Sequence, residues 1–139
     1  MLNNHNRQRG SISRIMVVDD EKDILRIIKR DLESSDANAT FKVDAFSDGE
    51  SALSAFNSHP ADYYDLVLTD IRMPKMNGFE LYRRLKQRNP SVKIAFITAF
   101  EINRDEFSKV LPSIDVKHFI KKPVRMSNLI PRLRSMIET

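Results

Sequence analysis

Hydrophobic and polar positions along this chain follow two alternating patterns. Short apolar runs rich in β-branched residues, typical of strands, lie at 15–18, 41–45, 66–68, 94–97 and 116–121. Between and after them, apolar residues recur every three or four positions, as on one face of a helix, at 24–32, 52–56, 79–85, 107–111 and 126–137. The pattern therefore predicts five strands and five helices in strict alternation.

This alternation predicts the fold class. Strands separated by helices form a parallel sheet with right-handed crossovers and helices on both faces. The first, third and fourth apolar runs carry no charge, which suits central strands, whereas the second and fifth contain charged residues, which suits edges. We predict an α/β fold, a single doubly wound domain of five βα units at 13–139, after a loose polar tail at 1–12.

Proline positions refine the helix boundaries. Asn89 and Pro90 are expected to close the third helix, and Pro112 to stop the fourth. Pro131 falls inside the last apolar stripe, where it lacks a backbone donor. We therefore expect Asn128 to cap a helix that starts late, so that Pro131 lies in its first turn.

Polar residues follow four of the predicted strands at the point where each strand ends. They are Asp19 with Asp20, Asp70, Thr98 and Lys122. Taken alone, Asp70 is typical of a turn, Asp20 of a helix cap and Thr98 of a strand. However, the carboxyl ends of parallel strands meet at one edge of the sheet, where such folds bind ligands. The sequence therefore predicts one cluster there.

The residue types in this cluster suit phosphate chemistry. Three carboxylates close together repel one another unless a cation intervenes, and a hard divalent ion with oxygen ligands is the simplest one. Lys122 offers a positive charge and Thr98 a hydroxyl to phosphoryl oxygens. Asp70 remains as the nucleophile, because carboxylates can form aspartyl phosphates.

The same residues resemble the motifs of a known family. Over 13–139 the chain is similar to CheY-like response-regulator receiver domains of two-component signalling. The resemblance rests on the acidic pair Asp19-Asp20, Asp70 within DIRMP, Gly78 within MNGFEL, Thr98-Ala99, and Lys122-Pro123. It implies a flavodoxin-like fold with strand order 2-1-3-4-5.

The resemblance also implies a role for each site residue. Asp70 is the expected site of phosphorylation, with Mg²⁺ or Mn²⁺ as cofactor. The expected metal ligands are Asp19, Asp20, Asp70 and the backbone carbonyl of Arg72. The residues expected to bind the phosphoryl group are Thr98, Ala99 and Lys122. Thr98 and Phe119 are the expected switch pair, although Phe119 also fits as plain core, and the peptide bond before Pro123 is expected to be cis.

Two departures from the family pattern concern the same part of the chain. Between Thr98 and Lys122 the sequence is about two residues longer than the family pattern, and Pro112-Ser113 replaces a usual glycine, so we expect an irregular fourth helix.

The resemblance also places Arg72 and Phe100 beside the path by which water would attack the phosphoryl group. Because both are large, we expect slow loss of the phosphoryl group.

The implied function is signalling rather than enzymatic turnover. A sensor histidine kinase or phosphotransfer protein would phosphorylate Asp70 and switch the face formed by the fourth helix, fifth strand and fifth helix. Two alternatives stay open. An aspartyl-nucleophile phosphatase would need a second aspartate where Arg72 stands. The other alternative is a phosphorylation-independent adaptor of the same fold. The complete set of acidic residues argues against it, and a Mg²⁺ titration would distinguish the adaptor from a phosphorylated receiver.

Composition narrows the remaining classes. The chain has 139 residues, net charge +4 and no cysteine, which excludes disulfides and thiolate chemistry. Without an apolar run of membrane-span length, a cytoplasmic protein with no membrane contact is expected. No basic and aromatic pattern indicates nucleic-acid binding. The predicted output face carries many basic residues, so an acidic partner, or pairing with a second copy through Asp115, is expected there: Arg104, Lys109, Lys117, Lys121, Arg125, Arg132 and Arg134.

Overall fold

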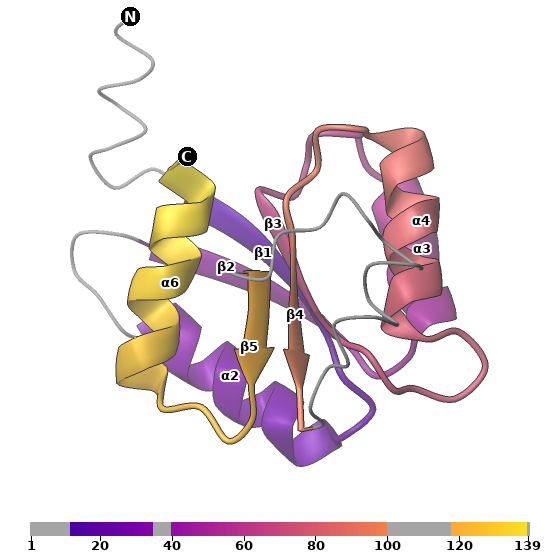
Figure 1. The fold of residues 1–139 in the computed structure, drawn as a ribbon. Helices are drawn as coiled ribbons and strands as arrows, with labels where there is room; N and C mark the ends of the chain where they lie inside the picture. Colours follow the sequence, from indigo (N-terminus) through magenta and orange to yellow (C-terminus); the bar gives the residue numbers. More distant parts are fainter. Residues whose placement is uncertain (1–11, 35–39, 100–117, 139) are drawn as a thin grey trace, which may run out of the picture.

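A computed structural model describes residues 12–34, 40–99 and 118–138 (Figure 1). Its elements are β1 (Ile12–Val18), α2 (Lys22–Ser34), β2 (Thr40–Phe46), α3 (Gly49–Asn57), β3 (Leu66–Asp70), α4 (Gly78–Arg88), β4 (Ile94–Thr98), β5 (Phe119–Lys121) and α6 (Met126–Glu138). The expected fourth helix at 107–111, with its irregularity, lies outside the described residues. None of the described helices is long and apolar enough to cross a membrane.

The five strands form one parallel sheet in the order β2-β1-β3-β4-β5. This order confirms the predicted fold class, with the uncharged apolar runs 15–18, 66–68 and 94–97 in the three central strands. Every residue of β3 and β4 is buried. The sheet is parallel, so the carboxyl ends of all five strands lie at the same edge.

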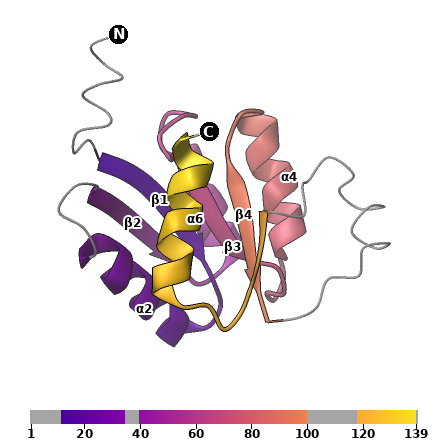
Figure 2. The same cartoon turned by 60° about the vertical axis from the view of Figure 1, so that its left-hand side comes forward.

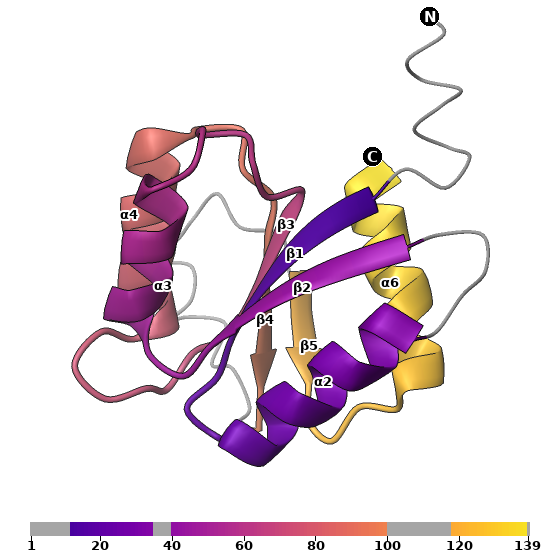
Figure 3. The same ribbon diagram turned by 180° about the vertical axis from the view of Figure 1, so that it is seen from behind.

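Helices cover both faces of the sheet. α2 and α6 lie on one face, and α3 and α4 on the other (Figures 1 and 3). Figure 2 shows α6 and α4 on opposite sides of the sheet. Each face carries its own hydrophobic core: Leu32 of α2 and Leu133 of α6 belong to one, and Phe56 of α3 and Leu85 of α4 belong to the other. Each fully buried side chain of this size contributes about 2 kcal/mol. The two cores hold the strands in place from both sides.

Local polar contacts fix where α3 and α4 begin. Asp48 precedes α3 and accepts the Ser51 N–H at 2.7 Å, while Asn77 precedes α4 and accepts the Glu80 N–H at 2.9 Å. Each side-chain oxygen satisfies a backbone donor that has no partner within the helix. These caps hold the helices that start beside the carboxyl end of the sheet.

The prediction for the start of α6 is wrong. The helix runs unbroken from Met126, and the N–H groups of Asn128 and Leu129 both donate to the Arg125 carbonyl at 2.9 Å. Asn128 is therefore inside the helix and does not cap it. Pro131 lies within the helix on an exposed position, where water can satisfy the carbonyl that loses its N–H partner.

Two strand starts also differ from the prediction. β5 begins at Phe119 rather than near residue 116, and His118 precedes the strand instead of lining it. β1 begins at Ile12, which the sequence pattern assigned to the tail, because Ile12 pairs with Thr40 of β2. Backbone pairing, which exceeds the apolar run in β1 and falls short of it in β5, decides these ends.

Side chains of α2 bond to the outer edge of β2. Figure 3 shows the ribbons of α2 and β2 from behind. The Lys29 ammonium donates to the Val43 carbonyl at 2.6 Å, and the Glu33 carboxylate accepts the Val43 N–H at 2.9 Å. Lys29 and Glu33 also pair with each other at 3.1 Å. The outward backbone groups of Val43 are therefore bonded without a further strand.

Candidate functional site

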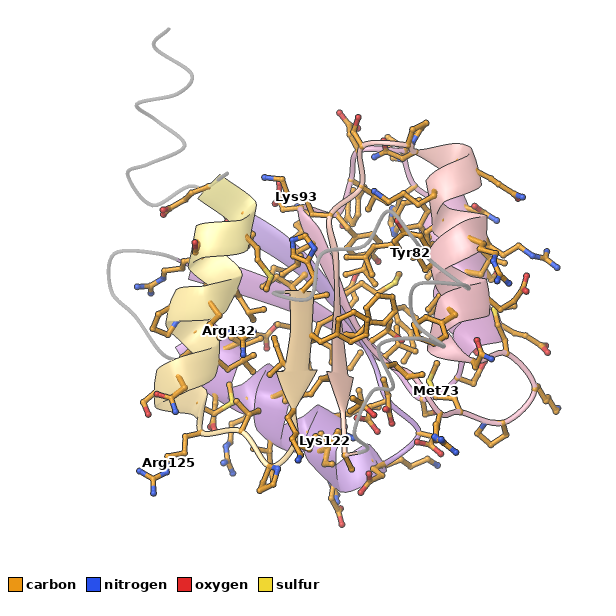
Figure 4. The ribbon with its side chains drawn as sticks, in the orientation of Figure 1. Met73, Tyr82, Lys93, Lys122, Arg125 and Arg132 are labelled. Atoms are coloured by element: carbon orange, nitrogen blue, oxygen red, sulfur yellow. The ribbon has the colours of Figure 1, made fainter. Side chains whose placement is uncertain are left out.

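The carboxyl ends of four strands bring the predicted polar residues together. Asp19 follows β1, Asp70 ends β3, Thr98 ends β4 and Lys122 follows β5. Asp19, Asp70 and Thr98 are buried, and the Lys122 side chain is only 9% exposed. Figure 4 shows Lys122 at this end of the sheet and Lys93 at the opposite end. The structure thus brings together four residues that are far apart in sequence.

Lys122 is the electrostatic centre of the site. Its ammonium nitrogen lies 2.6 Å from Asp19 Oδ2, 3.3 Å from Glu21 Oε1 and 3.5 Å from Asp70 Oδ2. The Lys122 backbone N–H donates to the Thr98 carbonyl at 2.8 Å, which joins the end of β5 to β4. The peptide bond from Lys122 to Pro123 is cis, as the resemblance implies.

Burial acts on the pKa of all three central groups. Burial raises the pKa of Asp19, and the Lys122 ammonium offsets only part of this. Burial and the nearby Asp19 charge raise the pKa of Asp70. For Lys122, burial lowers the pKa, but Asp19 and Asp70 outweigh it and the pKa is raised. One ammonium therefore compensates the carboxylates incompletely.

The turn after Asp70 is held by a close backbone contact. Asp70 Oδ1 accepts the Ile71 N–H at 2.8 Å, and the Gly78 N–H donates to the Ile71 carbonyl at 2.8 Å. A Cβ atom added at Gly78 would lie 2.2 Å from the Asp70 carbonyl oxygen. Only glycine permits this approach, which explains why the resemblance includes Gly78.

The carboxylates form a group that suits a hard cation. Oxygens of Asp19, Glu21 and Asp70 lie within 4.8 Å of one another. Oxygen ligands and uncompensated negative charge fit Mg²⁺. The exposed Asp20 is not part of this group in the structure. Sequence reasoning missed Glu21, although its position two residues after Asp19 was an available clue.

The Glu21 backbone also begins α2. Its N–H donates to Asp19 Oδ1 at 2.9 Å, and its carbonyl accepts the Leu25 N–H at 3.2 Å. The first backbone bond of α2 thus starts from Glu21, one residue after Asp20, so Asp20 does not occupy the cap position that one alternative assigned to it. Glu21 is fixed at the backbone while its side chain is 59% exposed.

Phe119 begins β5, beside Phe96 of β4, and is only partly buried. Its ring stacks on Phe96 with centroids 5.1 Å apart, and Phe79 meets Phe96 edge-on at 5.3 Å. The Arg132 guanidinium donates to the Phe119 carbonyl at 3.1 Å, and Figure 4 shows Arg132 extending from α6 toward β5. Phe119 therefore contacts both the aromatic core and α6.

The remaining predicted residues lie at the surface or outside the described chain. Ala99 and Arg72 are exposed beside the site. Lys121 and Arg125 are exposed on the predicted output face, with Arg125 pointing away from the sheet (Figure 4). The predictions for five further residues concern positions outside the described residues: Phe100, Arg104, Lys109, Asp115 and Lys117.

Comparison with known proteins assigns the family. Residues 15–134 match the family described as "Response regulator receiver domain". "Response regulator ArlR" of Staphylococcus aureus (strain NCTC 8325 / PS 47) is 31% identical over 127 residues, covering 91% of this chain and 53% of that protein. The chain thus spans about half the length of the curated relatives it matches.

Solved structures agree in fold. A receiver domain protein from Clostridium thermocellum has TM-score 0.76 and 25% identity, covering 91% of this chain and 94% of that one. Chemotaxis protein CheY4 of Vibrio cholerae has TM-score 0.75 and 19% identity, covering 91% and 99%. The site geometry, the matched family and these folds lead to one conclusion: this chain belongs to the response regulator receiver domain family.

Proposed function

We propose that this receiver domain is switched by phosphorylation of Asp70 in two-component signalling. The donor would be a phosphohistidine on a sensor histidine kinase or a phosphotransfer protein. The observation that carries the proposal is the convergence of Lys122 on Asp19 and Asp70 at the buried carboxyl end of the sheet. The site is built to hold a transferred phosphoryl group against one nucleophilic carboxylate.

The two oxygens of Asp70 have different surroundings. The Ile71 N–H holds Oδ1, whereas Oδ2 faces Lys122. We expect Oδ2 to attack phosphorus in line while the bond from phosphorus to the imidazole nitrogen breaks and its electron pair stays on the imidazole. Lys122 would neutralise charge on a phosphoryl oxygen. Positioning and neutralisation account for most of the catalysis in such transfers.

The ligands proposed for Mg²⁺ or Mn²⁺ are Asp19, Asp20, Asp70 and the carbonyl of Arg72, with Glu21 beside them. When bound, the ion supplies positive charge that compensates the phosphoryl oxygens and the carboxylates. The raised pKa values of Asp19 and Asp70 support this assignment, because burial disfavours their ionised forms and Lys122 offsets only part of that cost.

The proposed response starts from the phosphoryl oxygens. They would bind Lys122, the Ala99 N–H and the Thr98 hydroxyl, and Thr98 would move toward them. Phe119 could then enter the space that Thr98 leaves, shifting an equilibrium between two packings. Because Arg132 binds the Phe119 carbonyl, the change would reach α6 as well as β5.

Phosphorylation with a small donor tests the proposal. Incubation with acetyl phosphate and Mg²⁺ should add one phosphate, measured by intact mass, and Asp70→Asn should prevent it. Asp62→Asn is the charge-matched control, because Asp62 is an exposed aspartate in the loop before β3, whereas Asp70 ends that strand, and it should be labelled normally. Equal labelling of Asp70→Asn would refute the assignment. A wild-type chain that is not labelled and does not bind Mg²⁺ would favour the phosphorylation-independent adaptor. Continued hydrolysis of acetyl phosphate over many turnovers would favour the phosphatase.

The domain boundary and output face are further proposals. We propose that 13–139 folds independently of the segment 1–12. We also propose that basic residues in β5 and just before α6, such as Lys121 and Arg125, meet an acidic partner or a second copy. Sedimentation with and without beryllofluoride, at several salt concentrations, tests the second proposal. A salt-insensitive monomer in both states would exclude self-association.

A further inference from the structure

Lys122 has as many donors as it has carboxylate neighbours. An ammonium group carries three N–H donors. Within the described residues its nitrogen lies within 3.5 Å of oxygens from three side chains, those of Asp19, Glu21 and Asp70. A phosphoryl oxygen that binds Lys122 therefore has to replace one of these partners.

Glu21 is the partner that can leave. The Asp19 side chain is fully buried, and its carboxylate holds both Lys122 and the Glu21 N–H. Asp70 would itself carry the phosphoryl group. The Glu21 side chain is 59% exposed and its contact with Lys122 is 3.3 Å. It can turn into water without a change in the backbone, which Asp19 and α2 hold.

We propose that Glu21 holds the Lys122 ammonium before phosphorylation and is displaced by the incoming phosphoryl oxygen. Glu21 is thus a positioning residue that weakens the affinity of the site for phosphoryl groups. Displacement costs one partly exposed ion pair, which is worth about a threefold change in affinity. The inference rests on the proposed function of Asp70 and Lys122.

Three variants separate the contact from the charge. Glu21→Gln removes the charge at nearly the same size. Glu21→Asp keeps the charge but is one methylene shorter, so it cannot reach Lys122 equally well. Asp23→Asn is the matched control, because Asp23 lies two residues away on α2 and pairs with the exposed Arg26 instead. Calorimetry first determines the Mg²⁺ concentration that saturates each variant.

Beryllofluoride is then titrated at saturating Mg²⁺, and amide NMR shifts of Thr98, Ala99 and Lys122 report binding. Glu21→Gln and Glu21→Asp should both bind beryllofluoride about threefold more tightly than wild type, and Asp23→Asn should equal wild type. Unchanged affinity in Glu21→Gln would overturn the inference. So would tighter binding in Glu21→Gln with wild-type affinity in Glu21→Asp, or an equal gain in Asp23→Asn.

The wild-type titration separates this inference from the proposed function. If wild type binds no beryllofluoride at saturating Mg²⁺, the proposed function fails, and the inference with it. If wild type binds and the Glu21 variants do not differ from it, only the role of Glu21 is overturned.

Discussion

The two ends of the sheet bury polar side chains in opposite ways. Before β3, the Tyr64 hydroxyl donates to Asp44 at 2.7 Å, and the Arg14 N–H donates to Asp65 at 2.8 Å. The Arg14 guanidinium also donates to the Tyr63 hydroxyl at 2.8 Å. Each of these groups has a matched partner. Such bonds stabilise the fold, because burial without a partner would be costly.

The carboxyl end has a different balance. Asp19 and Asp70 are buried beside each other, and burial raises the pKa of both although Lys122 is near. Ionised carboxylates there reduce stability, because burial disfavours their charge and Lys122 compensates it only in part. The comparison teaches that burial alone does not mark a functional site. What marks it is charge left incompletely compensated at a shared strand end.

The largest effect is expected where the carboxyl end depends on backbone contact. Gly78→Ala would place Cβ 2.2 Å from the Asp70 carbonyl oxygen, so the turn must shift. We expect a loss of roughly 3 kcal/mol in unfolding free energy, together with weaker Mg²⁺ binding, measured by urea denaturation and calorimetry. Gly49→Ala, where Cβ would meet the flexible Met76 side chain at 3.0 Å, should cost less. Equal losses would contradict this account.

Removing one bond at the matched end should come next. Tyr64→Phe deletes the hydroxyl that donates to Asp44 and leaves the ring in the core. The unfolding free energy should fall by about 1–2 kcal/mol, with unchanged phosphorylation by acetyl phosphate. Thermal denaturation and intact mass measure the two results. A stabilised Tyr64→Phe variant would break the comparison between the two ends.

Neutralising one carboxylate at the carboxyl end should have the opposite sign. Asp70→Asn should raise the unfolding free energy by roughly 1 kcal/mol at neutral pH, because it removes a buried charge beside Asp19.

The pH dependence of this gain follows from the raised pKa of Asp70. Below about pH 4 the carboxyl is neutral in both folded and unfolded wild type, so the gain from Asp70→Asn should vanish. It should grow as the pH rises from about 4 toward the raised folded-state pKa, because the unfolded carboxyl ionises first, and it should level off above that pKa. Urea titrations from acid to neutral pH measure this. A gain that is largest in acid would contradict the sign.

The smallest expected effect concerns the lifetime of the phosphoryl group. The side chain of Arg72 is exposed beside the site, and Phe100 follows two residues after Thr98. If they crowd the path of water, Arg72→Asn and Phe100→Glu should each speed phosphate loss a few-fold, which is less than about 1 kcal/mol in the barrier. Phosphate release after donor removal measures this. Unchanged or slower release in both variants would exclude crowding.

The sequence was sufficient for the fold and for the meeting of Asp19, Asp70, Thr98 and Lys122. The reason is physical: residues at the carboxyl ends of parallel strands share one edge, whatever their separation in the chain. The contact between Glu21 and Lys122 was out of reach, because it depends on the conformation of two long side chains. The start of α6 was also mispredicted, since the Arg125 carbonyl outweighed the capping preference of Asn128.

The hydrogen bonds that join Lys29 and Glu33 to the Val43 backbone have a consequence for association between molecules of this protein. An open strand edge invites pairing with a strand of another chain, which leads to aggregates. At β2 a strand of another chain would first have to break the hydrogen bonds that Lys29 and Glu33 make with the Val43 backbone. We expect this flank to stay inert in concentrated solution. Any association, including the one proposed for β5 and α6, would then have to use another part of the surface.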